Sequence, residues 1–405
     1  MTPVDVVIVG GGIGGASLAG ALARGGLAVT VLEASTAYAD RVRGESMQAW
    51  GVGEAKELGV EGVLLAAGAH IAPVWKSFDA DGTERLEFPM STMVPGVAGT
   101  LNLRHPIACQ ALIDDAEAVG ATVVRGVSDV HVDAGPSPRV TYSMGDSVAE
   151  VEAGLVVGAD GRASTVRRAA GITLERQDAF SYIAGLLVEG LEVPDDHDLL
   201  VSDEGQFSLL FHQGDGRARS YLCSGLSHKH RFAGREGAAH FLEACAESVH
   251  PSIAALADAT VAGPCAAYAG DDTWTDTPYG EGVVLIGDAA GHNDPVIGQG
   301  LSIALRDARI VRDLLLDGAR TPDAFVAYGQ ERTSRMERLR LIADVIAVSE
   351  AEDAANQPAR REFVAQQNAD PDSGLLALLI GAFAGPETVP DELVDTTWPD
   401  RIRAA

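Results

Sequence analysis

The 405-residue sequence has little positive charge and no run of Lys or Arg residues. It carries 30 Lys and Arg residues against 58 Asp and Glu residues, so its formal net charge is −28. The mean field of such a chain repels the phosphates of nucleic acids and anionic lipids. The composition therefore excludes the usual nucleic-acid-binding classes, and we expect no nucleic-acid partner.

Cysteine is also scarce, and its four positions are scattered. They form no C-x-x-C pair and have no metal-ligand spacing, so we expect free buried thiols and no metal site. The opening residues "MTPVDVVIVG" lead straight into a strand without a basic n-region, which predicts no secretory signal. Together these features favour a cytoplasmic protein. The four cysteines are Cys109, Cys223, Cys245 and Cys265.

Long apolar runs are missing as well. The longest, "LLALLIGAFAG" at residues 375–385, is shorter than the roughly 18 to 20 residues that a membrane span needs. We expect a buried helix there, with an interfacial anchor as the weaker alternative, and no stable membrane insertion. Since 46% of the residues are hydrophobic, a chain of this length can form two or three subdomains.

What the sequence does have is glycine, concentrated in two strand-to-helix turns. The first, in "DVVIVGGGIGGASLAGALARGGLAVTVLEAS", carries G-x-G-x-x-G at Gly10, Gly12 and Gly15, with Glu33 ending the second strand. Gly10 permits a tight turn, Gly12 lets a diphosphate approach the backbone, and Gly15 allows close helix–strand packing. Glu33 can bind a ribose diol and would repel a 2′-phosphate, so the turn predicts FAD or NAD; a purely structural turn is the alternative.

The second turn lies in "VVLIGDAAGHNDPVIGQGLSIALRDA", residues 283–308, again between an apolar strand and a helix. Two such turns suggest a long ligand held at both ends. Between them, residues 172–267 alternate apolar and polar side chains, as at Phe207, Leu209 and Phe211, which predicts antiparallel strands. We expect this inserted sheet to form the roof of a substrate site.

Three separated motifs point to one family: Gly10-x-Gly12-x-x-Gly15 with Glu33, the segment "GADGRASTVR" from Gly158, and "GDAAGHNDPVIGQG" from Gly287. In this order, over residues 5 to about 340, they resemble the single-component (group A) FAD-dependent monooxygenases, the para-hydroxybenzoate hydroxylase-like aromatic hydroxylases. The sequence of Asp307, Tyr328 and Arg332 also fits the helices that follow in that family.

The resemblance implies an α/β fold. It consists of a Rossmann-like FAD-binding domain with a parallel sheet and helices, an inserted antiparallel-sheet substrate domain and a C-terminal helical segment. The expected FAD-binding parts are residues 1–75, 101–171 and 269–320, the substrate-binding strands are residues 76–100 and 172–268, and the helical region is residues 321–405.

The resemblance also implies how FAD binds, with its ADP half over the first glycine turn and its isoalloxazine over the second. Asp288 would hydrogen-bond the ribityl chain, Arg104 would lie near the ribityl and phosphates, and Asp160 near the diphosphate. A helix N-terminus with free N–H groups would stabilise anionic reduced flavin. The implied cofactor residues are Gly10, Gly12, Gly15, Glu33, Arg43, Arg104, Asp160, Asp288, Gly298, Gln299 and Gly300.

The implied reaction uses NADH or NADPH as a transient co-substrate, because the chain has no second G-x-G-x-x-G turn for a nicotinamide domain. Oxygen would then form a flavin hydroperoxide, which hydroxylates or epoxidises a small aromatic or polycyclic substrate. Pro295 would lie beside the flavin edge. Family members often place His where Gly291 stands here; His292 and Asn293 therefore either face the active site or only satisfy the turn.

Substrate contacts are expected from the inserted sheet, at side chains that could equally be plain core. Three other functions stay open: a flavin halogenase, disfavoured because the four Trp residues stand alone and W-x-W-x-I-P is missing; a reductase or desaturase of an isoprenoid; and a non-catalytic FAD-binding protein. The sequence indicates no oligomeric state. The candidate substrate residues are Tyr182, Phe207, Phe211, His212 and Tyr221.

Overall fold

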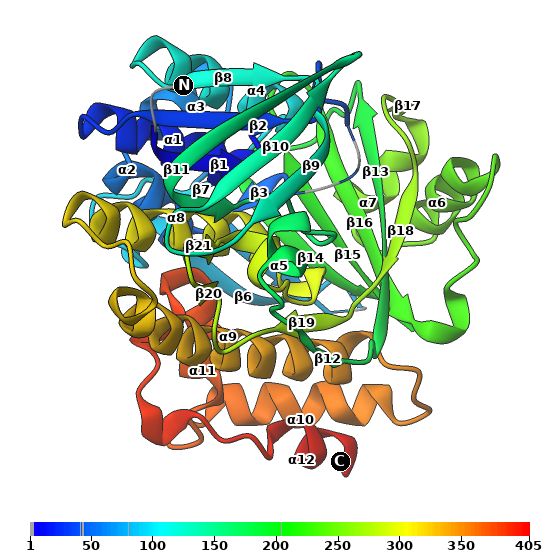
Figure 1. Ribbon diagram of the computed structural model, residues 1–405. Helices are drawn as coiled ribbons and strands as arrows, with labels where there is room; N and C mark the ends of the chain where they lie inside the picture. The colour runs from blue at the N-terminus through cyan, green and yellow to red at the C-terminus, as the bar shows by residue number, and fades with distance from the viewer. Residues whose placement is uncertain (1–3, 41, 43, 80, 204) are drawn as a thin grey trace.

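The computed structural model describes residues 4–40, 42, 44–79, 81–203 and 205–405 (Figure 1). It has the expected α/β architecture, with a parallel sheet covered by helices, a second large sheet beside it and a group of helices at the C-terminal end. In Figure 1 the green strands of the second sheet lie next to the blue N-terminal unit, and the orange and red helices lie together below both.

The first sheet carries both glycine turns at one edge. Its strand order is β20-β21-β11-β1-β2-β8, and β1 pairs in parallel with both β2 and β11, while β11 pairs in parallel with β21. Because the carboxyl ends of parallel strands share an edge, the turns after β1, β11 and β21 converge there. The strands are β1 (Val4–Val9), β2 (Val29–Glu33), β8 (Thr122–Arg125), β11 (Ser147–Gly158), β20 (Tyr279–Gly280) and β21 (Val283–Leu285).

Helices and a hairpin cover the two faces of this sheet. One face packs apolar side chains such as Val6 of β1 against α1 (Ile13–Arg24), α4 (His105–Ala118) and α8 (Gly300–Leu316), where Leu18 and Leu305 belong to the same core. On the other face β9 (Ser128–Asp133) and β10 (Arg139–Met144) form an antiparallel ribbon with the first half of β11, and α5 (Thr165–Ala169) packs beside them. The sheet is thus buried on both sides, as its continuous apolar strands predict.

The second sheet has the order β17-β13-β16-β15-β14-β5-β6, with β18 paired to β13. One face packs on α6 (Gly237–Ala246) and α7 (Pro251–Ala254) through a cluster that includes Leu186, Leu210 and Phe241. The other face is left for the candidate site. The strands are β5 (Val74–Phe78), β6 (Glu84–Pro89), β13 (Ser181–Glu189), β14 (His197–Asp203), β15 (Gln206–His212), β16 (Ala218–Gly225), β17 (Thr260–Val261) and β18 (Ala266–Ala269).

Two small sheets and two short helices connect the large units. One sheet joins β3 (Ser46–Met47), β4 (His70–Ala72) and β7 (Thr100–Asn102), and the other pairs β12 (Glu175–Gln177) with β19 (Asp272–Trp274). The helices are α2 (Ala49–Glu57) and α3 (Glu61–Ala66). The predicted domain boundaries themselves stay predictions.

The C-terminal helices pack around a core of their own. Long α9 ends in a π-helical turn, η7, and its Leu339 packs with Leu375, Leu378 and Trp398. The run predicted as a buried helix forms α11. Across the described residues, no helix is both long and apolar enough to cross a bilayer. The elements are α9 (Val326–Ile346), η7 (Ala347–Ala351), α10 (Gln357–Ala369), α11 (Leu375–Ala384) and α12 (Trp398–Arg403).

Candidate active site

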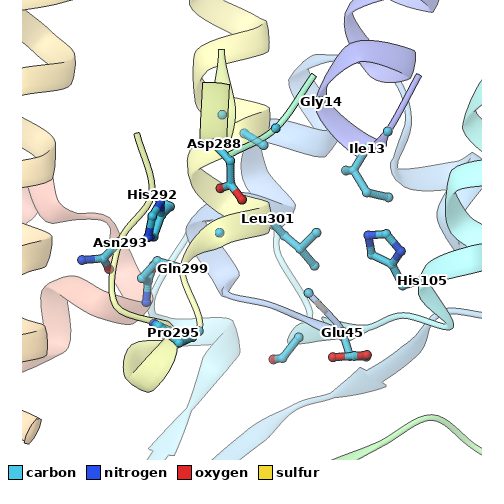
Figure 2. A pocket seen from close by; sticks show the side chains of 18 of the residues that line it. Ile13, Gly14, Glu45, His105, Asp288, His292, Asn293, Pro295, Gln299 and Leu301 are labelled. Carbon is cyan, nitrogen blue, oxygen red and sulfur yellow. The ribbon is translucent and has the colours of Figure 1, made fainter. Parts of the chain in front are cut away.

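One large cavity of about 820 Å³ connects the two glycine turns with the free face of the second sheet. Its walls come from the first turn, the segment after β11, the second turn, strands β5, β6, β13, β15 and β16, and helices α10 and α11. Figure 2 shows Asp288 and Pro295 on one side of the space around Leu301, with Ile13 and His105 opposite. Segments far apart in the sequence therefore form a single site.

In the first turn, two glycines are required by packing and one faces open space. A Cβ on Gly10, whose φ is +105°, would lie 2.3 Å from the Ala159 carbonyl oxygen, and one on Gly15 would lie 2.0 Å from the Gly10 carbonyl oxygen. A Cβ on Gly12 would meet no atom within 4 Å. Gly10 and Gly15 thus close the turn, and Gly12 leaves room for a ligand to approach the backbone.

Glu33 fixes this turn from the end of β2. Its carboxylate accepts hydrogen bonds from the backbone N–H groups of Gly11 at 2.6 Å and Ser35 at 2.7 Å, and the side chain is buried. Glu33 also lines the cavity. The predicted contact with a ribose diol stays a prediction, and the structure adds that the same carboxylate shapes the turn.

Asp160 lies at the cavity wall and accepts hydrogen bonds from the start of α5, whose N-cap residue is Ser164. Its carboxylate accepts hydrogen bonds from the Ser164 hydroxyl at 2.5 Å and the Thr165 N–H at 2.6 Å. Arg167, from the same helix, donates to the Ala289 carbonyl at 2.9 Å and so ties this segment to the second turn. Asp160 therefore supports the first turn of α5 together with the N-cap residue Ser164, and its contact with a diphosphate stays a prediction.

A buried ion cluster holds the second turn. Asp307 is fully buried; it accepts the Gly287 N–H at 2.8 Å and pairs with Arg332 at 3.1 Å and Arg335 at 2.6 Å. Arg332 also donates to the Gly291 carbonyl at 2.9 Å. Burial opposes ionisation, but the two guanidinium groups hold the pKa of Asp307 below its usual value. The cluster fixes the backbone that faces the cavity.

The start of α8 presents its backbone to the cavity. Gly298 has a φ of +63°, which favours glycine, and a Cβ on Gly300 would meet no atom within 4 Å. The Gln299 side chain points elsewhere: it accepts the Trp50 indole N–H at 2.9 Å and donates to the Ala382 carbonyl at 3.0 Å. Any contact of Gln299 with a cofactor must therefore use its backbone, as predicted.

Asp288 lies in the second turn and lines the cavity. Its side chain is 35% exposed, and it accepts a hydrogen bond from Arg162 Nε at 3.4 Å. Among the described residues this is the only partner of its carboxylate, so the carboxylate caps no helix. Asp288 is free to bind a ligand, and the ribityl contact stays a prediction.

His292, Asn293 and Pro295 all line the cavity. His292 Nδ1 lies 2.8 Å from the Thr273 hydroxyl, and burial, followed by the charge of Arg162, lowers the pKa of its imidazole. The Asn293 amide donates to Asp272 at 2.7 Å, while its Oδ1 has no partner among the described residues. Both polar side chains thus connect the turn to β19 and also border the cavity. The two roles that the sequence left open, satisfying the turn and facing the site, are therefore compatible.

Sequence reasoning missed Ser46 and Gln48. Both are buried, both line the cavity, and the Ser46 hydroxyl and Gln48 Oε1 have no partner among the described residues. They follow the loop after β2 and belong to no motif. Only the long-range pairing of β3 with β7 brings them to the second turn, so no local signal could have found them.

The alternation of side chains along each strand decides which candidate substrate residues face the cavity. Phe211 and Tyr221 line the cavity, and the Tyr221 hydroxyl donates to Glu45. Phe207 lies on the same face of β15 but is fully buried, in a cluster that includes Ala343 and Ala351, and does not line the cavity. Tyr182 and His212 are one residue out of phase and point to the opposite face of the sheet, so neither lines the cavity; Ile183 does so in place of Tyr182.

Arg104, one of the two predicted arginines, does not line the cavity. Arg104 caps α4, and its guanidinium donates to the Gln213 carbonyl at 3.3 Å and pairs with Asp215 at 3.2 Å; the neighbouring His105 lines the cavity instead. Arg43 lies outside the described residues. In the described part of the chain, no group of three or more His, Cys, Asp or Glu side chains could hold a metal ion.

Comparison with known proteins identifies the family of this chain and two sequence relatives. A family described as "FAD binding domain" matches residues 3–341. The chain is 28% identical over 320 residues to squalene epoxidase 3 of Arabidopsis thaliana, covering 78% of this chain and 60% of that protein. It is 27% identical over 378 residues to 6-methylpretetramide 4-monooxygenase of Streptomyces rimosus, covering 85% and 84%.

The fold also matches solved structures. That of Pseudomonas aeruginosa PqsL in complex with 2-aminobenzoylacetate superimposes with a TM-score of 0.73 at 23% identity, covering 86% of this chain and 97% of that one. At this identity the likeness shows the fold alone. The chain spans about 60% of the length of the squalene epoxidase that it matches.

Proposed function

The chain belongs to the FAD binding domain family, and from this premise we propose that it is an FAD-dependent monooxygenase. We propose that it uses NADH or NADPH and O2 to hydroxylate or epoxidise a small, largely apolar aromatic or polycyclic substrate. The family assignment confirms the resemblance drawn from the three glycine-containing motifs. The activity and substrate class are supported by the site described above and by the names of the two sequence relatives, one an epoxidase and the other a monooxygenase.

The first turn fits the dinucleotide half of FAD. Gly12 leaves its surroundings open, so two phosphates can approach the backbone at the start of α1, where unpaired N–H groups and the helix dipole favour negative charge. The Glu33 carboxylate lies at the end of β2 and lines the same cavity, within the part that a ribose would occupy. These groups would hold the adenosine diphosphate portion.

The second turn fits the flavin half. The backbone at Gly300 is open to the cavity at the start of α8, and Ser46, Gln48 and Asn293 each offer a buried polar atom without a partner among the described residues. A buried polar group without a partner costs about 1 to 3 kcal/mol, so such atoms indicate a missing polar ligand. The flavin ring has the amide and carbonyl groups that would satisfy them.

Bound FAD would supply the redox chemistry and the reaction with O2, which side chains cannot perform. The protein's own part is to bind, orient and exclude water. The apolar face of the second sheet, with Ile183, Leu209 and Phe211, keeps the substrate end dry. Because burial lowers the pKa of His292, this residue borders the cavity as a neutral imidazole at pH 7. Its Nδ1 lies 2.8 Å from the Thr273 hydroxyl and its Nε2 lies 3.4 Å from the Asp271 carboxylate, so both ring nitrogens are held by the protein.

The observation that carries the proposal is the single cavity joining both glycine turns to the free sheet face. A carrier that only binds FAD would need no second, apolar chamber beside the second turn. We also propose that the protein works in the cytoplasm, which is supported by its four free cysteines.

The test is a screen of aromatic and polycyclic compounds with the FAD-loaded protein, NADPH or NADH, and ¹⁸O2. We expect some compounds to accelerate flavin bleaching and to yield products that contain one ¹⁸O atom. Product formation without O2 uptake would instead identify a reductase or desaturase. Bromide- or chloride-dependent halogenated products would identify a halogenase, and failure of both nicotinamides to bleach the flavin with every compound would refute an oxygenase.

A further inference from the structure

The cavity continues along the second sheet, well beyond the second glycine turn. The short helix η5 (Pro295–Ile297) contacts β13, whereas β5 lies four strands further along the order β13-β16-β15-β14-β5. At about 4.8 Å per strand, four steps correspond to roughly 19 Å. The residues of β5 and β6 that line the cavity therefore form an end remote from the turn that faces the flavin.

The path toward this end is apolar and aromatic. Trp75 lies with its ring centroid 6.2 Å from that of Phe211 and 5.3 Å from that of Phe383, and Phe88 lies 5.8 Å from Phe383. These side chains come from β5, β15, α11 and β6, and all of them line the cavity. Such walls suit a flat, extended hydrocarbon framework.

The remote end itself is closed by ion pairs whose charges balance. Arg85 pairs with Glu350 at 3.0 Å and also with Asp79, while Arg361 pairs with Glu350 at 2.8 Å. The Ser202 hydroxyl donates to Glu350 at 2.8 Å. Two guanidinium groups thus face two carboxylates. Arg85 and Glu350 both line the cavity, so its end wall is polar but close to neutral.

Beside this wall, Ser77 presents a hydroxyl with no protein partner. The residue is 5% exposed, its Oγ makes no hydrogen bond within the described part of the chain, and it lines the cavity. Ser77 lies two residues after Trp75 on β5, so both side chains are on the same face of the strand. Asn368 of α10 also lines the cavity, and its Oδ1 has no partner among the described residues. Buried polar atoms of this kind point to a ligand.

We propose that Ser77 and the adjoining Arg85–Glu350 wall form a polar subsite for a neutral hydrogen-bonding group, a hydroxyl or carboxamide, at the end of an elongated aromatic substrate. The inference rests on the proposed function and narrows its substrate class. An anionic group is disfavoured because the guanidinium of Arg85 is already paired with two carboxylates. The subsite would orient the substrate so that its apolar end reaches the flavin.

The experiment measures binding of three matched probes to the full-length, FAD-loaded protein without NADPH, by flavin difference spectra and tryptophan fluorescence. The probes are 2-(hydroxymethyl)anthracene, 2-methylanthracene and anthracene-2-carboxylate. We expect the hydroxymethyl compound to bind about three- to tenfold more tightly than the methyl compound, the range for one net hydrogen bond. The carboxylate should bind most weakly.

Ser77→Ala should abolish the preference of the hydroxymethyl over the methyl compound while leaving the affinity for the methyl compound unchanged. Ser17→Ala is the matched control: Ser17 is also a buried serine whose hydroxyl lacks a partner among the described residues, but it lies in α1 and does not line the cavity. It should keep the preference.

Tightest binding of the carboxylate, a preference that persists in Ser77→Ala, or failure of all three probes to bind would each overturn the subsite. The outcome is independent of the proposed reaction, because binding needs neither NADPH nor O2. A preference that depends on Ser77 in a protein that never incorporates oxygen would retain the subsite and refute the monooxygenase.

Discussion

Replacing Asp288 by Ala should weaken FAD binding without unfolding the protein. In the structure this carboxylate lines the cavity, and its only partner in the described part of the chain is Arg162 at 3.4 Å. If it accepts a ribityl hydroxyl, the variant loses a charge-assisted hydrogen bond of about 1.5 to 3 kcal/mol. Because the side chain is 35% exposed, water screens the interaction and we expect the lower end, roughly a tenfold rise in the FAD dissociation constant.

The folded protein should hardly be affected. A partly exposed ion pair contributes about 0 to 1 kcal/mol, and the Asp288 side chain is 35% exposed. Melting of the apo-protein should therefore stay near that of the wild type, while the yellow colour is lost on dialysis. Asp288→Asn should lose less affinity, since its amide oxygen still accepts a hydrogen bond.

The assay is titration of apo-protein with FAD, followed by flavin fluorescence, together with thermal melts of each apo-variant. A variant that melts early but binds FAD normally once folded would show a purely structural role. Normal FAD affinity in a well-folded Asp288→Ala protein would refute the placement of the ribityl chain at the second turn.

Three further predictions follow from single residues. Gly12→Val should abolish FAD binding, because its side chain would fill the space left for the diphosphate, yet circular dichroism should show a normal fold; a yellow Gly12→Val protein would contradict this. Asp307→Ala should cost about 3 to 5 kcal/mol in urea unfolding at pH 7, since it removes the carboxylate that pairs with the buried Arg332 and leaves Arg335 with Glu331 alone. Folding lowers the pKa of Asp307, so the stability that its carboxylate confers is present above its unfolded pKa near 3.9 and is lost as the pH falls through its folded pKa. If Asp307→Ala lowered the free energy of unfolding as much at pH 2 as at pH 7, this would be refuted. Burial raises the pKa of Asp294 to about 8, so this residue lowers the stability of the fold progressively between about pH 4 and 8. Asp294→Asn should therefore be more stable than the wild type at pH 8. Unchanged or lower stability of the variant would argue against a buried neutral acid.

The glycine turns could be predicted from the sequence because their constraints are local. Gly10 has a positive φ, Gly15 has no room for a Cβ beside the Gly10 carbonyl, and Glu33 follows at the end of the next strand. A short segment therefore contains every residue that the turn requires. The parallel order of β1, β11 and β21 then brings three motifs to one edge. The resemblance of these motifs to a flavoprotein family supplied the fold.

The substrate end could not be predicted in the same way. An aromatic residue in a strand can belong to either face, and the phase that selects Ile183 over Tyr182 is set by sheet packing rather than by residue type. Phe207 has the correct phase but is fully buried in a cluster with Ala343 and Ala351, which come more than a hundred residues later in the chain. Ser77 belongs to no motif, and only the pairing of β5 with β14 brings it to the cavity.

If one cavity holds FAD between the two glycine turns, the flavin released when the purified protein is denatured can be identified and quantified directly. We expect one non-covalently bound FAD per chain, because the first turn is shaped for a dinucleotide and the second for the flavin ring. Release of FMN in place of FAD would contradict it, since FMN lacks the adenosine half that the Gly10 to Gly15 turn is built to hold.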